Sequence, residues 1–112
     1  MKTISIANDF TRYPGGRYRK HGKGSGEEFR EDFLVPTLDR EEEVTIVLDG
    51  TAGYSSSFLE EAFGGLIRRG YGRERLHRLL KFKADGVFKT YESMIWKYVD
   101  VNKSGSGTES RS

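Results

Sequence analysis

The sequence contains no cysteine, only two prolines and no long apolar run, and each absence narrows what the chain can be. Without cysteine there is no disulfide, no thiolate catalysis and no Cys-based zinc or iron–sulfur site. No apolar stretch approaches the ~18–20 residues that cross a bilayer, and the N-terminal MKTISIANDF lacks the apolar core of a signal peptide. We therefore expect a cytoplasmic protein without a membrane segment.

The length and composition of the chain fit one small globular domain. The 112 residues match the usual domain size of ~100–150. An aromatic share of 12% is too high for a disordered chain. From residue 102 the sequence turns to NKSGSGTESRS, which buries nothing. We predict an α/β domain over residues 1–101 and a flexible Gly/Ser-rich tail over residues 102–112.

The charge balance gives no general reason to expect nucleic acid as a partner. There are 19 basic and 17 acidic residues, for a net charge of +2. Basic residues do cluster within 12–23, where Tyr13 and Tyr18 lie among them, and again within 68–83. We interpret both clusters as solvated surface and do not expect nucleic acid, with a nucleic-acid face on the first cluster left as an alternative.

Four segments have the pattern of strands. Ile4 and Ile6 alternate with polar neighbours, which predicts a half-buried strand. The sequence YPGG at 13–16 predicts a turn, after which residues 17–20 are expected to return as the second strand of a hairpin. The run EVTIVLD at 43–49 predicts a central strand buried on both faces. An edge strand is expected near residues 77–83.

Helices are expected between these strands. Ser25 and Glu28 have the spacing of a capping box, which predicts a helix that Pro36 kinks or ends. A final helix is expected after Asp85, with Trp96 lying off its apolar face.

A middle helix is expected between these two, because the apolar residues between 58 and 67 form one broad stripe at helical spacing. Ser57 and Glu60 have capping-box spacing at its start, and Gly70 is its expected end. Gly64 and Gly65 each weaken a helix interior, so we expect this helix to approach the sheet closely there.

No catalytic constellation stands out. The two histidines, His21 and His77, are far apart in the sequence, so no metal site is expected. The acidic pairs at 27–28 and 60–61 fall in first helical turns, where carboxylates complement the helix dipole. We therefore expect no enzyme activity, no cofactor and no metal.

The glycine-rich loop at 22–26 resembles a phosphate cradle but departs from the known spacings. Gly24 stands in the Ser/Thr position of a Walker A loop, and Glu27 stands at the third glycine of a dinucleotide motif. Binding of an anion or nucleotide in another form remains an alternative. Its candidate residues are Arg17, Lys23, Gly24, Ser25, Gly26, Glu28 and Arg30.

Three consecutive serines follow the predicted buried strand and open the middle helix. Unpaired amides and the positive end of the dipole favour a negative group at such a position. A phosphate there adds about −1.5 to −2 charges and changes the surface that a partner meets. The alternative is plain N-capping by an unmodified serine. Our candidate phosphoacceptor and partner-binding residues are Tyr54, Ser55, Ser56, Ser57 and Phe58.

Several segments together resemble a known family. They are Gly16-Arg17, GSGEEFREDF at 24–33, VTIVLDG at 44–50 and SSSFLEEAFGGL at 55–66. The chain resembles the STAS-like domain of unknown function and, more distantly, the STAS domains of anti-sigma factor antagonists. The resemblance implies a small mixed sheet of about four strands with helices packed mainly on one face. It also implies a bacterial regulatory protein that binds a protein partner, such as a histidine-kinase-like ATPase or a transcriptional regulator.

In those antagonists an Asp-Ser-Ser motif begins a helix, and a partner kinase phosphorylates one serine. By resemblance Ser55 stands at the Asp position and Ser56 at the phosphoacceptor, while Phe58 replaces the glycine that follows. We therefore predict a non-catalytic regulatory interaction module. The alternatives are an anion- or nucleotide-binding protein or enzyme using residues 22–26, and a stand-alone, phage-type inhibitor of a host protein.

Overall fold

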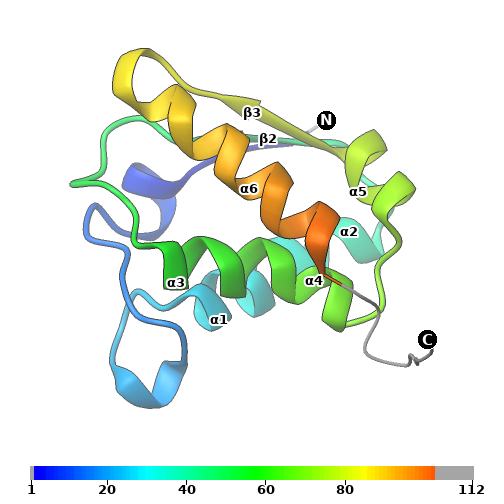
Figure 1. The fold of residues 1–112 in the computed structure, drawn as a ribbon, viewed down its shortest axis with the longest axis horizontal. Helices are drawn as coiled ribbons and strands as arrows, with labels where there is room; N and C mark the ends of the chain where they lie inside the picture. Colours follow the sequence, from blue (N-terminus) through cyan, green and yellow to red (C-terminus); the bar gives the residue numbers. More distant parts are fainter. Residues whose placement is uncertain (1, 103–112) are drawn as a thin grey trace.

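The computed structural model describes residues 2–102, and residues 103–112 of the predicted tail lie outside the described part. Three strands form one parallel sheet: β1 (Lys2–Ser5), β2 (Val44–Val47) and β3 (Leu80–Lys83). The middle strand β2 pairs with both neighbours, and Ile46 lies opposite Ile4 on one side and Phe82 on the other. Because each parallel pair needs a crossover, helices fill the chain between the strands (Figure 1).

The prediction of a mixed sheet of about four strands is therefore wrong, and the expected hairpin is absent from the described residues. After β1 the chain forms a π-helical turn, η1 (Ile6–Phe10), and residues 17–20 lie in a loop that contains a 3₁₀ turn, η2 (Arg19–His21). The Asp9 carboxylate accepts a hydrogen bond of 2.8 Å from the Ser5 amide. In a parallel ladder this amide points away from β2, so Asp9 occupies the edge where a hairpin strand would pair.

The expectation that β2 is buried on both faces is also wrong. Val44 and Ile46 are fully buried, whereas Thr45 and Val47 remain partly exposed. The alternation arises because the helices pack on one face of the sheet, as expected from the resemblance (Figure 1). No helix within residues 2–102 has both the length and the apolar composition needed to cross a membrane.

The first crossover is a nearly continuous helix made of α1 (Gly26–Phe29), the π-helical turn η3 (Arg30–Leu34) and α2 (Val35–Asp39). We expected Pro36 to kink or end this helix, and the helix does not end there. Pro36 lies in the first turn of α2, and the π-helical turn η3 directly precedes α2. The π-helical turn shifts the pattern of backbone hydrogen bonds just before Pro36, which lacks an amide hydrogen.

The second crossover has the same design, with α3 (Ser56–Leu59), the π-helical turn η4 (Glu60–Gly64) and α4 (Gly65–Arg68). Gly70, with φ of 113°, follows the helix as predicted. A short helix, α5 (Arg73–Leu79), then leads directly into β3, so the predicted strand is confirmed only from Leu80 onward.

The last helix, α6 (Lys89–Val101), follows a 3₁₀ turn, η5 (Gly86–Phe88), and begins after Asp85 as predicted. The side chain of Asp85 makes no cap bond. Trp96 covers a neighbouring element: its ring stacks on His77 with centroids 4.2 Å apart and meets Phe82 edge-on.

The two crossover helices touch backbone to backbone at Gly26. A Cβ on Gly26 would lie 2.6 Å from the Phe58 carbonyl oxygen and 3.0 Å from the Ala62 amide nitrogen. Gly64 and Gly65, which we expected to approach the sheet, instead face the side chains of Asn102 and Arg30.

We predict that Gly26→Ala lowers the free energy of unfolding by about 1–3 kcal/mol, the usual effect of forcing extra atoms into a packed contact. Chemical denaturation followed by circular dichroism measures the change. Gly15→Ala is the matched control, because a Cβ at Gly15 meets no atom within 4 Å. Equal stabilities of the two variants would contradict the close contact at Gly26.

Candidate interaction site

The serine cluster lies at the start of α3, beyond the carboxyl end of the central strand β2. Ser55 is the N-cap of this helix, and its Oγ accepts a hydrogen bond of 3.1 Å from the Phe58 amide. The cap therefore lies two residues earlier than the Ser57–Glu60 capping box that we expected, because Glu60 points instead toward arginines of other segments. Ser56 and Ser57 are consequently the first two residues of the helix.

The three serines differ in accessibility and in bonding. Ser55 and Ser56 are exposed and Ser57 is partly exposed. The Ser55 hydroxyl is engaged in the cap, whereas no side-chain hydrogen bond of Ser56 is recorded among the described residues. Ser56 is thus a solvent-facing hydroxyl on a helix start whose capping bond is made by its neighbour.

The two flanking aromatic residues are anchors of this helix start. The Tyr54 hydroxyl donates a hydrogen bond of 2.7 Å to the Leu48 carbonyl oxygen. The centres of the Tyr54 and Tyr91 rings lie 5.0 Å apart. Burial raises the pKa of the Tyr54 phenol to about 12. Phe58 is fully buried and packs against Phe29. These contacts anchor the start of α3 in the core. Because both rings are buried, Tyr54 and Phe58 offer little surface to a partner.

The glycine-rich loop reaches the same region from another part of the sequence. The Gly15 amide donates to the Gly24 carbonyl, and the Gly26 amide donates to the Gly16 carbonyl. The predicted capping residue Ser25 is confirmed, since its Oγ accepts from the Glu28 amide at 3.0 Å, while Glu28 accepts from the Gly24 amide. The backbone amides that an anion would need are thus largely bonded within the chain.

The cations proposed for anion binding are likewise engaged. Arg17 contacts Glu60 and Glu61, with 3.1 Å between its Nη1 and Glu61 Oε1. Arg30 Nη1 lies 2.6 Å from Glu61 Oε2 and also donates to the Glu61 carbonyl oxygen at 2.7 Å. Lys23 alone among these cations is exposed and forms no ion pair with another residue of 2–102. This geometry does not favour the glycine-loop alternative.

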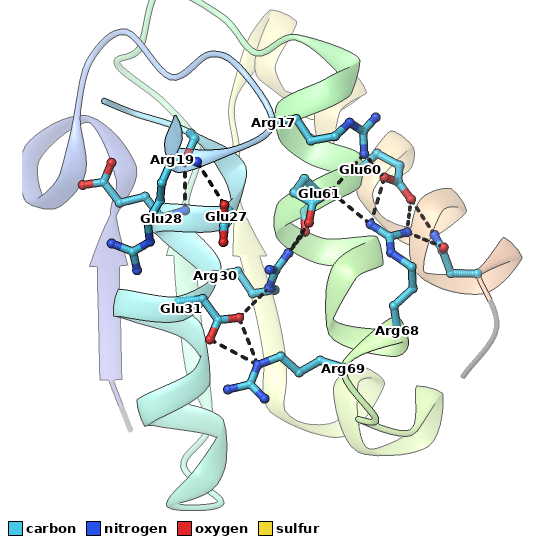
Figure 2. A network of polar contacts seen from close by, with 12 residues as sticks. Arg17, Arg19, Glu27, Glu28, Arg30, Glu31, Glu60, Glu61, Arg68 and Arg69 are labelled. Atoms are coloured by element: carbon cyan, nitrogen blue, oxygen red, sulfur yellow. Dashed lines mark hydrogen bonds and ion pairs between the residues drawn. The ribbon is translucent and has the colours of Figure 1, made fainter. Parts of the chain in front are cut away.

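Glu61 is the centre of a charge cluster that joins three segments (Figure 2). Its side chain is 9% exposed and meets Arg17 from the loop, Arg30 from the first crossover helix and Arg68 from its own helix. A buried carboxylate needs such partners, since an unpaired one is costly. From the sequence we expected Glu60 and Glu61 to complement the helix dipole, and the pairs with these arginines were not predicted.

The neighbouring carboxylates extend the cluster. Burial alone would raise the pKa of Glu60, but hydrogen bonds from Arg68, Arg17 and Asn102 outweigh it and lower that pKa to about 2. Glu31 accepts from Arg30 and Arg69, which lowers its pKa in the same way despite burial. Asn102, which we assigned to the tail, therefore takes part in the packing of the domain.

The sequence does contain a pattern that indicates this charge cluster. Glutamates and arginines recur at 27–31, 60–61 and 68–69, on the sides of helices whose opposite faces are apolar. Such a pattern on two helices predicts pairing when the helices cross, but the crossing itself is a tertiary feature. Only the structure assigns each arginine to its carboxylate.

We predict that Glu60→Gln destabilises the protein near neutral pH by about 1–2 kcal/mol. The pKa of Glu60 is about 2 in the folded state and near 4.5 when unfolded, so its contribution is complete above pH 4.5 and declines as the pH falls toward 2. Urea denaturation between pH 7 and 3 should show the two proteins converging in acid. Glu74→Gln is the control, because Glu74 is exposed; a gap that stays constant with pH would contradict the assignment.

Comparison with known proteins gives one match. The family described as STAS-like domain of unknown function matches residues 25–86, from the cap of α1 to the first residue of η5. No curated protein and no solved structure shows significant similarity to the chain. The matched segment covers more than half of the 112 residues and includes Gly26, Glu61 and the three serines. The chain therefore belongs to the family of STAS-like domains of unknown function.

Proposed function

We propose that this protein is a non-catalytic regulatory module that binds a bacterial signalling protein at the start of α3. The observation that carries the proposal is the exposed Ser56 hydroxyl at the first turn of a helix, directly beyond the central strand. The likeness to anti-sigma factor antagonists supports the same position, because their phosphoserine begins a helix in the corresponding place.

The helix start is suited to a switch that leaves the fold intact. Ser55 already supplies the cap, and Tyr54 and Phe58 anchor the helix from within. A phosphate on Ser56 adds about −1.5 to −2 charges at the positive end of the helix dipole, where a negative group is tolerated. The surface presented to the partner changes, whereas no core contact has to break.

The partner that we propose is a histidine-kinase-like ATPase or a transcriptional regulator. A kinase partner has to reach the Ser56 hydroxyl, and beside it Ser55 is exposed whereas the Tyr54 ring is buried. Gly50 and Ala52 are both exposed, and Gly53 has φ of 115°, a conformation that suits glycine. Residues 50–53 of this loop therefore carry only small side chains.

The experiment is affinity capture from the native host, with mass spectrometry of the bound proteins and of serine phosphorylation. We expect a specific partner and a phosphate on Ser56. We also expect Ser56→Glu to lower retention of that partner about tenfold or more, equivalent to about 1.4 kcal/mol.

The matched control is Ser93→Glu, which adds the same charge at an exposed serine of α6. Retention that falls equally in both variants would indicate a general charge effect. Capture of no partner and no phosphate, together with a tightly bound metabolite, would contradict the proposed function.

A further inference from the structure

The loop between η1 and α1 carries a concentration of positive charge that the proposed function does not use. Residues 10–26 contain five lysines and arginines and no aspartate or glutamate. Arg12, Lys20 and Lys23 are exposed, and none of them forms an ion pair with another residue of the described part. The loop projects from the body of the molecule beside the starts of α1 and α3 (Figure 1).

Exposed aromatic rings lie among these cations. Tyr13 is 76% exposed and Tyr18 is 39% exposed, which makes them two of the four large hydrophobic side chains most open to solvent among residues 2–102. The Lys20 ammonium lies 5.9 Å from the centre of the Tyr18 ring. Alternating cations and exposed rings are the pattern by which proteins hold single-stranded nucleic acid, with bases stacked on rings and phosphates on cations.

The loop is held in shape before any ligand arrives. Its base is closed by the backbone bonds from Gly15 to Gly24 and from Gly26 to Gly16. Arg17 is fixed by Glu60 and Glu61, and Arg19 by Asp32, with 2.6 Å between Nη2 and Oδ1. A preformed loop loses less conformational entropy on binding than a mobile one.

A pocket of about 390 Å³ opens on this loop and is lined by Tyr18, Arg19, Lys20 and Glu27. This volume falls in the roughly 300–1,000 Å³ range of small-ligand sites. A nucleotide matches the lining: the Tyr18 ring can stack with a base, Lys20 can contact a phosphate, and the Glu27 carboxylate can accept from a base amino group or a sugar hydroxyl, while Arg19 stays paired with Asp32.

The pocket lining favours a nucleotide over an acidic peptide as the ligand. The side-chain carboxylates of such a peptide are hydrogen-bond acceptors only and offer no base to the Tyr18 ring, whereas a nucleotide offers amino or hydroxyl donors to Glu27 and a base to Tyr18. A nucleotide brings donors and acceptors together in one unit. We infer that the basic loop spanning residues 12–23 binds single-stranded nucleic acid, with one nucleotide in the Tyr18–Lys20–Glu27 pocket and neighbouring phosphates at Arg12 and Lys23.

The test is fluorescence anisotropy with a labelled 12-nucleotide single strand of mixed sequence, as DNA and as RNA, at several salt concentrations. We expect Arg12→Ala/Lys20→Ala/Lys23→Ala to weaken binding at least tenfold and to reduce the slope of log K against log salt by about 2, since each single-strand phosphate contact contributes about 0.7. The control Arg40→Ala/Lys89→Ala/Lys97→Ala removes the same charge from other exposed positions and should retain the affinity.

Stacking is tested separately from charge. We expect Tyr18→Ala to weaken binding by roughly 5- to 150-fold, the range for loss of one stacked base, and Tyr18→Phe to retain it. Circular dichroism verifies that each variant is folded.

Four results would overturn the inference: no binding by either strand, an equal loss in the control triple variant, an unchanged affinity in Tyr18→Ala, or a 12-residue acidic peptide that binds as tightly as the strand. A mononucleotide that matches the strand in affinity would overturn the assignment to a strand and assign the pocket to a free nucleotide. None of these readouts depends on Ser56, so the proposed regulatory function stands or falls independently.

Discussion

The contact of Gly26 with the second crossover helix determines the arrangement of the rest of the structure. Its α-carbon lies so close to the Phe58 carbonyl that no side chain fits between them. At this distance Phe29, one turn further along α1, packs against Phe58 and Phe63 in the core. The same approach brings Arg30 to Glu61, so an apolar contact and a charged one depend on the same glycine.

The charged side of this contact connects the core to the surface. Glu61 receives Arg17 from the basic loop as well as Arg30 from the neighbouring helix, and it lies one and a half turns after the serines. Removing one partner of a buried ion pair leaves an uncompensated charge, so these pairs favour the arrangement in which all partners meet. In this domain the ion pairs of Glu61 connect the elements that carry two surfaces, the serine helix start and the basic loop.

Local signals in the sequence predicted elements well and predicted their pairing badly. The cap at Ser25, the stop at Gly70 and the strand around Ile46 were all readable, because each depends on neighbouring residues. The hairpin was wrongly expected because Asp9 occupies the edge on which its second strand would pair, and no periodicity in the sequence indicates that bond.

The candidate site was predictable to the same extent. Exposed serines at a helix start followed from the strand and the apolar stripe, although the cap is Ser55 and not Ser57. The pairing of Arg17 and Arg30 with Glu61 was not predictable, because Glu61 lies 44 and 31 positions away in the sequence. Family membership covers 25–86 and leaves the basic loop outside the matched segment.

The central claim is that the glycine contact and Glu61 hold the basic loop and the serine helix start as one unit. Amide hydrogen exchange, measured by mass spectrometry on the intact protein and on Glu61→Gln, tests it most directly. The account predicts that protection falls together in segments 15–30 and 54–62, while β2 and β3 keep theirs. Loss of protection confined to the helix that carries residue 61, with the loop unchanged, would contradict it.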